Sequence, residues 1–149
     1  MAQEEGRTHM DWQLLVVDDE ADVCKTLEKY LTFEGFKVMT ATSGAAAMDL
    51  VKTRKIHIAL IDIKMPGMTG IELLRRMKDV DYSIQVIIMT GYSTFDLAFQ
   101  AFEAGAADYI LKPFDEMSKI VQLITLSMDR LERWHKILAQ TIRQQKPAE

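Results

Sequence analysis

Five short apolar runs divide the chain at regular intervals. They span residues 14–17, 37–40, 58–61, 84–89 and 108–111. The first, third and fourth runs are almost continuously apolar, which is typical of strands whose two faces are both covered. The second and fifth runs are more mixed, as edge strands can be. The pattern therefore predicts three central strands and two edge strands.

Segments with a helical period lie between these runs. Val23, Leu27 and Leu31 recur every four residues, and Gly35 is a candidate stop for the helix that they predict. Further amphipathic stretches cover residues 45–51, 71–77 and 95–102, and a long one begins near Asp115. Ser43 is a candidate N-cap of the second helix. Strand and helix alternate five times, which predicts an α/β fold: a doubly wound five-stranded parallel sheet with helices on both faces.

Composition and charge exclude several classes of protein. The 149 residues suit one compact domain with a short appended element, and the net charge of −4 lacks the basic excess of a nucleic-acid-binding face. Cys24 is the single cysteine, so no internal disulfide can form. We find no secretory signal and no apolar run long enough to span a membrane, and therefore predict a cytoplasmic protein. Residues 1–10 are interpreted as disordered or left over from cloning.

Polar side chains follow four of the five predicted strands. Asp18, Asp19 and Glu20 follow the first, Asp62 the third, Thr90 the fourth and Lys112 the fifth. A single aspartate in such a place is more often a helix cap. However, the carboxyl ends of parallel strands meet at one edge of a sheet, and gathered carboxylates repel one another unless a cation compensates. Hard oxygen ligands suit Mg²⁺, and a nearby carboxylate, hydroxyl and ammonium favour phosphoryl transfer.

Four motifs give these residues a specific context. The chain resembles the receiver domains of bacterial two-component response regulators over about residues 13–128. The resemblance implies a flavodoxin-like receiver fold with strand order 2-1-3-4-5, extended here by a C-terminal helix. The motifs that carry it are LLVVDDE at 14–20, LIDIKMPG at 60–67 followed by Gly70, MTG at 89–91, and GAADYILKPF at 105–114.

The resemblance also implies a metal site. By position, Asp62 matches the family's phospho-acceptor and also contacts the metal. Asp19 matches the direct metal ligand, and Asp18 a second acidic residue that acts directly or through water. The backbone carbonyl of Lys64 completes the implied ligand set, and Mg²⁺ is the implied cofactor.

Further roles follow from the same resemblance. Thr90 matches the switch hydroxyl and Lys112 the ammonium, and both are expected to contact the phosphoryl group. Tyr109 matches the switch aromatic that packs inward on activation. Pro113 matches a cis-proline that orients Lys112. Lys64 and Tyr92 flank the site and are interpreted either as residues that tune the phosphoryl lifetime, in a direction left open, or as ordinary exposed residues.

The implied function is that of a phospho-accepting receiver, served by a sensor histidine kinase or a phosphotransfer protein. It is a signalling phospho-acceptor rather than an enzyme, although Mg-dependent self-phosphorylation and self-dephosphorylation are expected. Two alternative functions are compatible with this fold. A Mg-dependent phosphatase with an aspartyl nucleophile usually has a second aspartate two residues later, where this chain has Lys64. The second alternative is a constitutive interaction module of the same fold that is not phosphorylated.

The last segment extends beyond what the family fold needs. We divide the chain into residues 1–10, a receiver domain at 11–128 and a helical extension or linker at 129–149. Met117, Ile124, Leu131 and Leu138 repeat every seven residues, and the part after about Asp129 needs a partner for its apolar side chains. It is interpreted as a support for a homodimer, with a linker to an output domain or a helix folded back on its own domain as alternatives.

A row of phenylalanines in the fourth predicted helix has two interpretations. Phe95, Phe99 and Phe102 recur at helical spacing, which favours a place in the core. If they are exposed instead, they indicate an interface, because this family changes partners on the face formed by the fourth helix, fifth strand and fifth helix.

Overall fold

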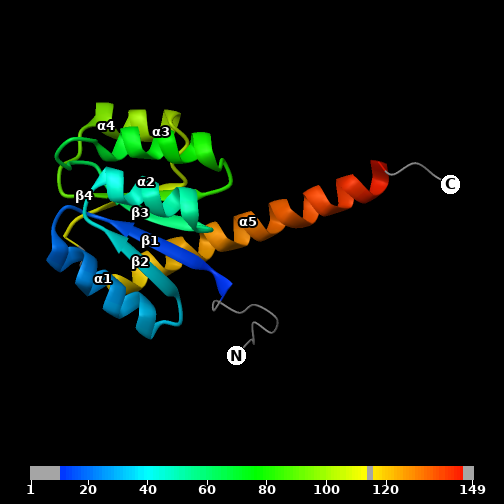
Figure 1. Ribbon diagram of the computed structural model, residues 1–149, viewed down its shortest axis with the longest axis horizontal. Helices are drawn as coiled ribbons and strands as arrows, with labels where there is room; N and C mark the ends of the chain where they lie inside the picture. The colour runs from blue at the N-terminus through cyan, green and yellow to red at the C-terminus, as the bar shows by residue number, and fades with distance from the viewer. Residues whose placement is uncertain (1–10, 114–115, 146–149) are drawn as a thin grey trace.

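In the computed structural model, residues 11–113 and 116–145 are described, and strands alternate with helices along them (Figure 1). The strands are β1 (Gln13–Val17), β2 (Lys37–Ala41), β3 (Ile58–Asp62), β4 (Gln85–Thr90) and β5 (Asp108–Leu111). The helices are α1 (Ala21–Phe33), α2 (Gly44–Thr53), α3 (Gly70–Val80), α4 (Phe95–Glu103) and α5 (Met117–Gln145). The predicted alternation is therefore confirmed. The predicted disordered segment at 1–10 and the predicted helix start near Asp115 lie outside the described residues.

The strands form one parallel sheet in the order β2-β1-β3-β4-β5, as expected from the motifs. The central strands are almost entirely buried, whereas β2 and β5 are partly exposed at the edges. The register aligns the carboxyl ends of neighbouring strands. Val17 pairs with Ile61, and Asp62 pairs with Met89, next to Thr90. Side chains that follow these ends are thus delivered to one edge of the sheet.

Helices cover both faces of the sheet. Figure 1 shows α2, α3 and α4 on one side and α1 and α5 on the other. Successive residues of a strand point to opposite faces, so β1 contributes to two cores. Leu15 belongs to the core that includes Leu74 of α3, and Leu14 to the core that includes Ile124 of α5. This two-sided burial explains why the central strands are continuously apolar.

Side-chain caps and glycines define the helix ends. Ser43, Thr69 and Thr94 each accept a backbone N–H from the first turn of the helix that follows, which confirms Ser43 as an N-cap. Gly35 and Gly105 adopt φ values of 99° and 97° after α1 and α4, a conformation that glycine adopts without steric cost. These capping residues and glycines determine where the helices begin and end, and therefore where the loops that carry the site lie.

The last helix runs from the sheet into solvent. Ile124 and Met128 of α5 are buried, and Leu131 is the last buried residue of this helix. From Arg133 to Gln145 every side chain is exposed, and Figure 1 shows this part projecting straight away from the domain. The interpretation that the segment folds back on its own domain is therefore wrong.

The phenylalanines of α4 do not lie in the core. Phe95 and Phe102 are 80% and 73% exposed, and Phe99 is also exposed. The rings of Phe95 and Phe99 are stacked with centroids 5.9 Å apart, and the ring of Phe102 is tilted against that of Phe99 at 6.2 Å. The core interpretation is wrong because α4 buries only Ala101 fully.

In the described parts of the chain, no helix is both long and apolar enough to cross a membrane.

Candidate functional site

Three carboxylates meet at the carboxyl edge of the sheet. Asp18 and Asp19 follow β1 directly, and Asp62 is the last residue of β3. One oxygen from each lies within 4.8 Å of the others. Asp18 and Asp62 are buried, whereas Asp19 is exposed to solvent. The sequence analysis predicted this cluster, and its oxygens are hard ligands of the kind that Mg²⁺ prefers.

Close backbone packing fixes the position of Asp62. A Cβ atom added to Gly70 would lie 2.1 Å from the Asp62 carbonyl oxygen, so only glycine fits there. The Gly70 N–H donates to the Ile63 carbonyl oxygen at 2.8 Å, and Gly67 turns the intervening loop at a φ of 85°. Both glycines stand in the motifs, but their contacts could not be read from the sequence.

Lys112 links two of the carboxylates. Its ammonium nitrogen lies 2.5 Å from Asp18 Oδ2 and 3.7 Å from Asp62 Oδ2. The other oxygen of Asp18, Oδ1, accepts the backbone N–H of Glu20 at 2.9 Å. Lys112 comes from the end of β5, before a cis peptide bond to Pro113 that was also expected. Asp18 is thus bound through both of its oxygens.

The charges in this cluster perturb one another. Burial raises the pKa of Asp62, and the negative charge of Asp18 adds to the effect, while the charge of Lys112 opposes it. Burial alone would lower the pKa of Lys112, but its hydrogen bond and charge interaction with Asp18 outweigh burial and raise it. The lysine therefore stays charged, and the carboxylate of Asp62 lies where positive charge stabilises it.

Two residues of the loop after β4 form hydrogen bonds with the side chains of Thr90 and Tyr109. The Thr90 hydroxyl donates to the Tyr92 carbonyl at 2.9 Å and accepts the Tyr92 N–H at 3.1 Å. The next residue, Ser93, shares a hydrogen bond of 2.9 Å between its hydroxyl and that of Tyr109. Thr90 and Tyr109 are thus bonded to adjacent residues of the same loop. The sequence analysis singled out both residues but gave no sign of Ser93.

A lysine and a tyrosine face each other beside the acidic cluster. The ammonium nitrogen of Lys64 lies 3.5 Å from the ring centroid of Tyr92, in cation–π geometry. Both residues line a pocket of about 330 Å³ together with Asp19, Asp62 and Thr90. The pair therefore covers part of the approach to Asp62. Sequence position placed both residues near the site but did not show that they touch.

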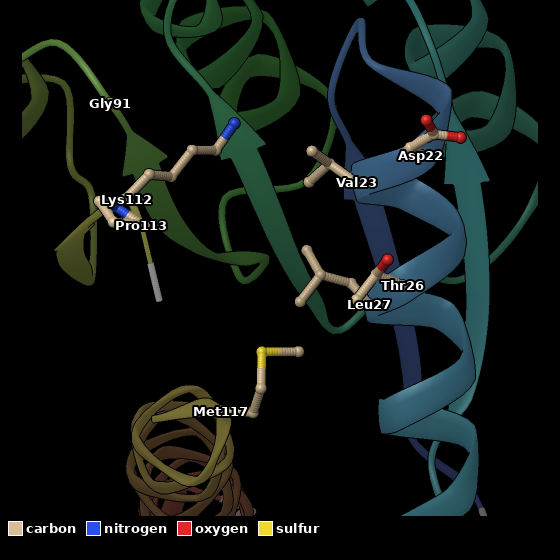
Figure 2. Close-up of a pocket in the computed structure, with 8 residues that line it drawn as sticks. All are labelled: Asp22, Val23, Thr26, Leu27, Gly91, Lys112, Pro113 and Met117. Atoms are coloured by element: carbon tan, nitrogen blue, oxygen red, sulfur yellow. The ribbon is translucent and has the colours of Figure 1, made fainter. Parts of the chain in front are cut away.

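A larger cleft adjoins this pocket between α1 and α5. Its volume is about 550 Å³, and most of its walls are aliphatic, with Val23, Leu27 and Met117 at its centre (Figure 2). Lys112 runs along one edge of the cleft, and its nitrogen points toward the end of β3 rather than into the cleft (Figure 2). None of the three clustered carboxylates lines the cleft, so the polar chemistry belongs to the smaller pocket.

The comparisons identify the family of this chain. The response regulator receiver domain family matches residues 14–125, and the chain belongs to this family. It is a phospho-accepting component of two-component signalling, and not an enzyme of the ordinary kind. Receiver domains bind Mg²⁺ in an acidic pocket and are phosphorylated by histidine kinases or phosphotransfer proteins. The residues clustered here fit such an ion.

Individual relatives agree with this assignment. Sporulation initiation phosphotransferase F of Bacillus subtilis is 40% identical over 106 residues, which is 71% of this chain and 86% of that protein. Transcriptional regulatory protein ZraR of Klebsiella oxytoca is 41% identical over 68% of this chain, and the match spans only 23% of ZraR. A CheY-like receiver domain structure from Methanospirillum hungatei has a TM-score of 0.79 at 29% identity, covering 82% of this chain and 97% of that one.

Proposed function

We propose that Asp62 is the residue that accepts the phosphoryl group and that Asp19 and Asp62, with the backbone carbonyl of Lys64, hold Mg²⁺, while Asp18 binds the ion directly or through water. The observation that supports this is the convergence of three carboxylates within 4.8 Å, with the ammonium of Lys112 beside two of them. Such a group of carboxylates is unfavourable unless a cation is bound.

The surroundings of the three carboxylates favour Asp62 as the nucleophile. Asp18 is bound through both oxygens, and it does not line the pocket. Asp19 lies on the exposed rim. Asp62 is buried but still lines the pocket, and its Oδ2 lies 3.7 Å from the Lys112 nitrogen. A buried carboxylate beside a cation is held in one orientation, which favours in-line attack on an incoming phosphoryl group.

A carboxylate oxygen of Asp62 attacks phosphorus while the bond from phosphorus to the donor breaks, which leaves an acyl phosphate on Asp62. Bound Mg²⁺ would supply positive charge beside the phosphoryl oxygens. The ammonium of Lys112 is positioned to donate a hydrogen bond to one of these oxygens. The same groups would support a slow attack of water on the phosphorus, which breaks its bond to the Asp62 oxygen, releases inorganic phosphate and restores the carboxylate; this is the self-dephosphorylation that we expect.

The loop after β4 provides a route from the phosphoryl group to the surface. When the Thr90 hydroxyl turns to the phosphoryl group, it gives up both of its hydrogen bonds to Tyr92. The loop then shifts and loosens the bond between Ser93 and Tyr109, so that Tyr109 repacks inward. Phosphorylation thereby shifts a two-state equilibrium at the α4–β5 face. As donors we propose a sensor histidine kinase or a phosphotransfer protein in the cytoplasm.

A phosphate-affinity gel tests the acceptor and the metal together. The purified chain is incubated with acetyl phosphate and Mg²⁺ beside Asp62→Asn and a control, Asp49→Asn, which changes an exposed aspartate on α2. We expect a retarded band in the wild type and in the control, none in Asp62→Asn, and none when EDTA is added first. Retardation of Asp62→Asn would refute the assignment. No retardation of the folded wild type would favour the constitutive interaction module.

A further inference from the structure

A hydrogen bond between two side chains joins the loop after β4 to the neighbouring strand β5. The hydroxyl of Ser93 lies 2.9 Å from the hydroxyl of Tyr109. The Tyr109 ring is half-buried and packs against the core that includes Leu74, whereas its bond to Ser93 lies at the surface. Within the described residues, no other hydrogen bond holds the Tyr109 side chain. Ser93 therefore fixes where the tip of this tyrosine lies.

The bond can form in only one orientation of the tyrosine. The backbone of Tyr109 is fixed in the sheet, where it pairs with Ile88 of β4, so that only its side chain is able to turn. A change of rotamer moves a tyrosine hydroxyl by several ångströms, which is more than a hydrogen bond tolerates. The bond to Ser93 is therefore lost when the ring turns away.

Ser93 lies between a residue that has to move and one that is anchored. On one side, Tyr92 is bonded through its N–H and its carbonyl to the Thr90 hydroxyl, and both bonds break when that hydroxyl turns to the phosphoryl group. On the other side, the Thr94 hydroxyl caps α4 by accepting a backbone N–H of the first turn at 3.2 Å. A shift of Tyr92 is therefore taken up at Ser93, and it changes the distance from Ser93 to Tyr109.

We infer that Ser93 is a positioning residue of the switch. Its hydroxyl holds Tyr109 in the resting orientation, and so it sets how much of the unphosphorylated chain occupies the active state. The inference rests on the proposed function, because the bond acts only through the response of Thr90 to a phosphoryl group at Asp62. The motif at 89–91 ends before Ser93 and gives this residue no role.

The strength of one hydrogen bond sets the size of the effect. A bond that replaces hydrogen bonds to water changes an equilibrium constant by about two- to tenfold. Without the bond, the active orientation of Tyr109 becomes more populated by this factor, while the resting orientation still predominates. A ligand that binds only the active state then binds more tightly by the same factor, because its apparent affinity is proportional to the fraction of competent protein.

The affinity for beryllofluoride measures this fraction. Beryllofluoride is a tetrahedral analogue of a phosphoryl group on a carboxylate, and calorimetry measures its binding in the presence of Mg²⁺. We expect Ser93→Ala to bind it about two- to tenfold more tightly than the wild type. Ser93→Thr keeps a hydroxyl and should bind it as the wild type does. The matched control, Ser83→Ala, removes a hydroxyl that donates to Asp81 Oδ1 before β4, and it should leave the affinity unchanged.

A double-mutant cycle tests whether the effect passes through the tyrosine. Tyr109→Phe removes the same hydrogen bond from the other side and should also tighten binding. If the two residues act through one bond, the double variant of Ser93→Ala and Tyr109→Phe binds no more tightly than the single variants. Urea unfolding identifies a purely structural role, which would lower the unfolding midpoint of Ser93→Ala and leave its affinity for beryllofluoride unchanged.

Three results would overturn this inference. They are an affinity of Ser93→Ala that is unchanged or weaker, a Ser93→Thr variant that binds as tightly as Ser93→Ala, and an additive effect in the double variant. If the wild type still binds beryllofluoride and Asp62→Asn does not, the proposed function stands in each of these cases. Binding by Asp62→Asn, or none by the folded wild type, would instead refute the proposed function and this inference with it.

Discussion

Replacing Gly70 with alanine tests how tightly the acceptor strand is packed against α3. The added Cβ would lie 2.1 Å from the Asp62 carbonyl oxygen, 2.8 Å from the Asp62 carbonyl carbon and 2.9 Å from Ile63 Cα. All three atoms belong to the backbone, so no side-chain rotation can relieve the collision. Either the first turn of α3 or the end of β3 has to move.

The size of the effect follows from these contacts. Overpacking in a well-packed interior costs about 1–3 kcal/mol and sometimes more, and a collision with backbone belongs at the upper end. The better helix propensity of alanine returns about 1 kcal/mol at most. We therefore expect a loss of about 2–3 kcal/mol in the free energy of unfolding. With a urea m-value of about 2 kcal/mol/M, the unfolding midpoint falls by about 1–1.5 M.

Urea unfolding followed by circular dichroism, together with the phosphate-affinity gel, measures both consequences. The matched control is Gly91→Ala, because a Cβ there would lie 3.7 Å from Lys112 Cβ, an ordinary contact. We expect Gly91→Ala to keep nearly all of its stability and Gly70→Ala to be both less stable and slower to accept phosphoryl groups. A Gly70→Ala midpoint within about 0.3 M of the wild type would refute the packing argument.

Three further predictions concern the core, a half-buried histidine and the residues that cover the site. Met128→Ala should cost about 3 kcal/mol in urea unfolding, because Met128 is completely buried between α5 and the sheet. Burial, and then the charge of a nearby lysine, lower the pKa of His57, whose Nδ1 accepts the Gln13 N–H. The unfolded chain therefore binds more protons, so this contribution is fully present above about pH 6.5 and is lost as the pH falls below it. Tyr92→Ala should shorten the phosphoryl lifetime severalfold in a gel time course, because the ring that Lys64 covers shields Asp62 from water.

Each of these predictions has a control in the same chain. Leu126→Ala changes an exposed leucine of α5 and should cost far less than Met128→Ala. His57→Gln should flatten the fall in stability between about pH 7 and 5, and an unchanged slope would contradict the assignment. Tyr82→Ala removes an exposed tyrosine that pairs with a lysine outside the site, and it should leave the phosphoryl lifetime unchanged.

The strands and the acidic edge could be predicted because their signals are local. The runs around Leu14 and Ile58 are apolar on both faces, and Asp18 and Asp62 follow them directly in sequence. A parallel sheet then brings these residues together whatever the details of packing. Boundaries shifted by a residue: Ile84 precedes β4, and Asp62 ends β3 instead of following it. Such shifts depend on backbone hydrogen bonds that the apolar pattern does not record.

The parts that could not be predicted depend on contacts between distant segments. Phe95 and Phe99 have the spacing of core residues, but α4 packs on the body through a narrow face around Ala101 and leaves the rings outside. Likewise, the approach of Lys64 to Tyr92 joins two loops that only the folded sheet brings together. The roles assigned to the individual site residues, and the division at residue 129, stay predictions.

The unbroken course of α5 gives the molecule a mechanical property. A 29-residue helix is about 44 Å long, and its first half lies against the sheet near the site. Because no break separates this half from the projecting half, the two halves tilt as one rigid rod. A tilt of about 10° at the sheet would displace the tip by roughly 4 Å, with the part beyond Leu131 about 21 Å long. A small displacement beside the sheet is therefore amplified at the far end.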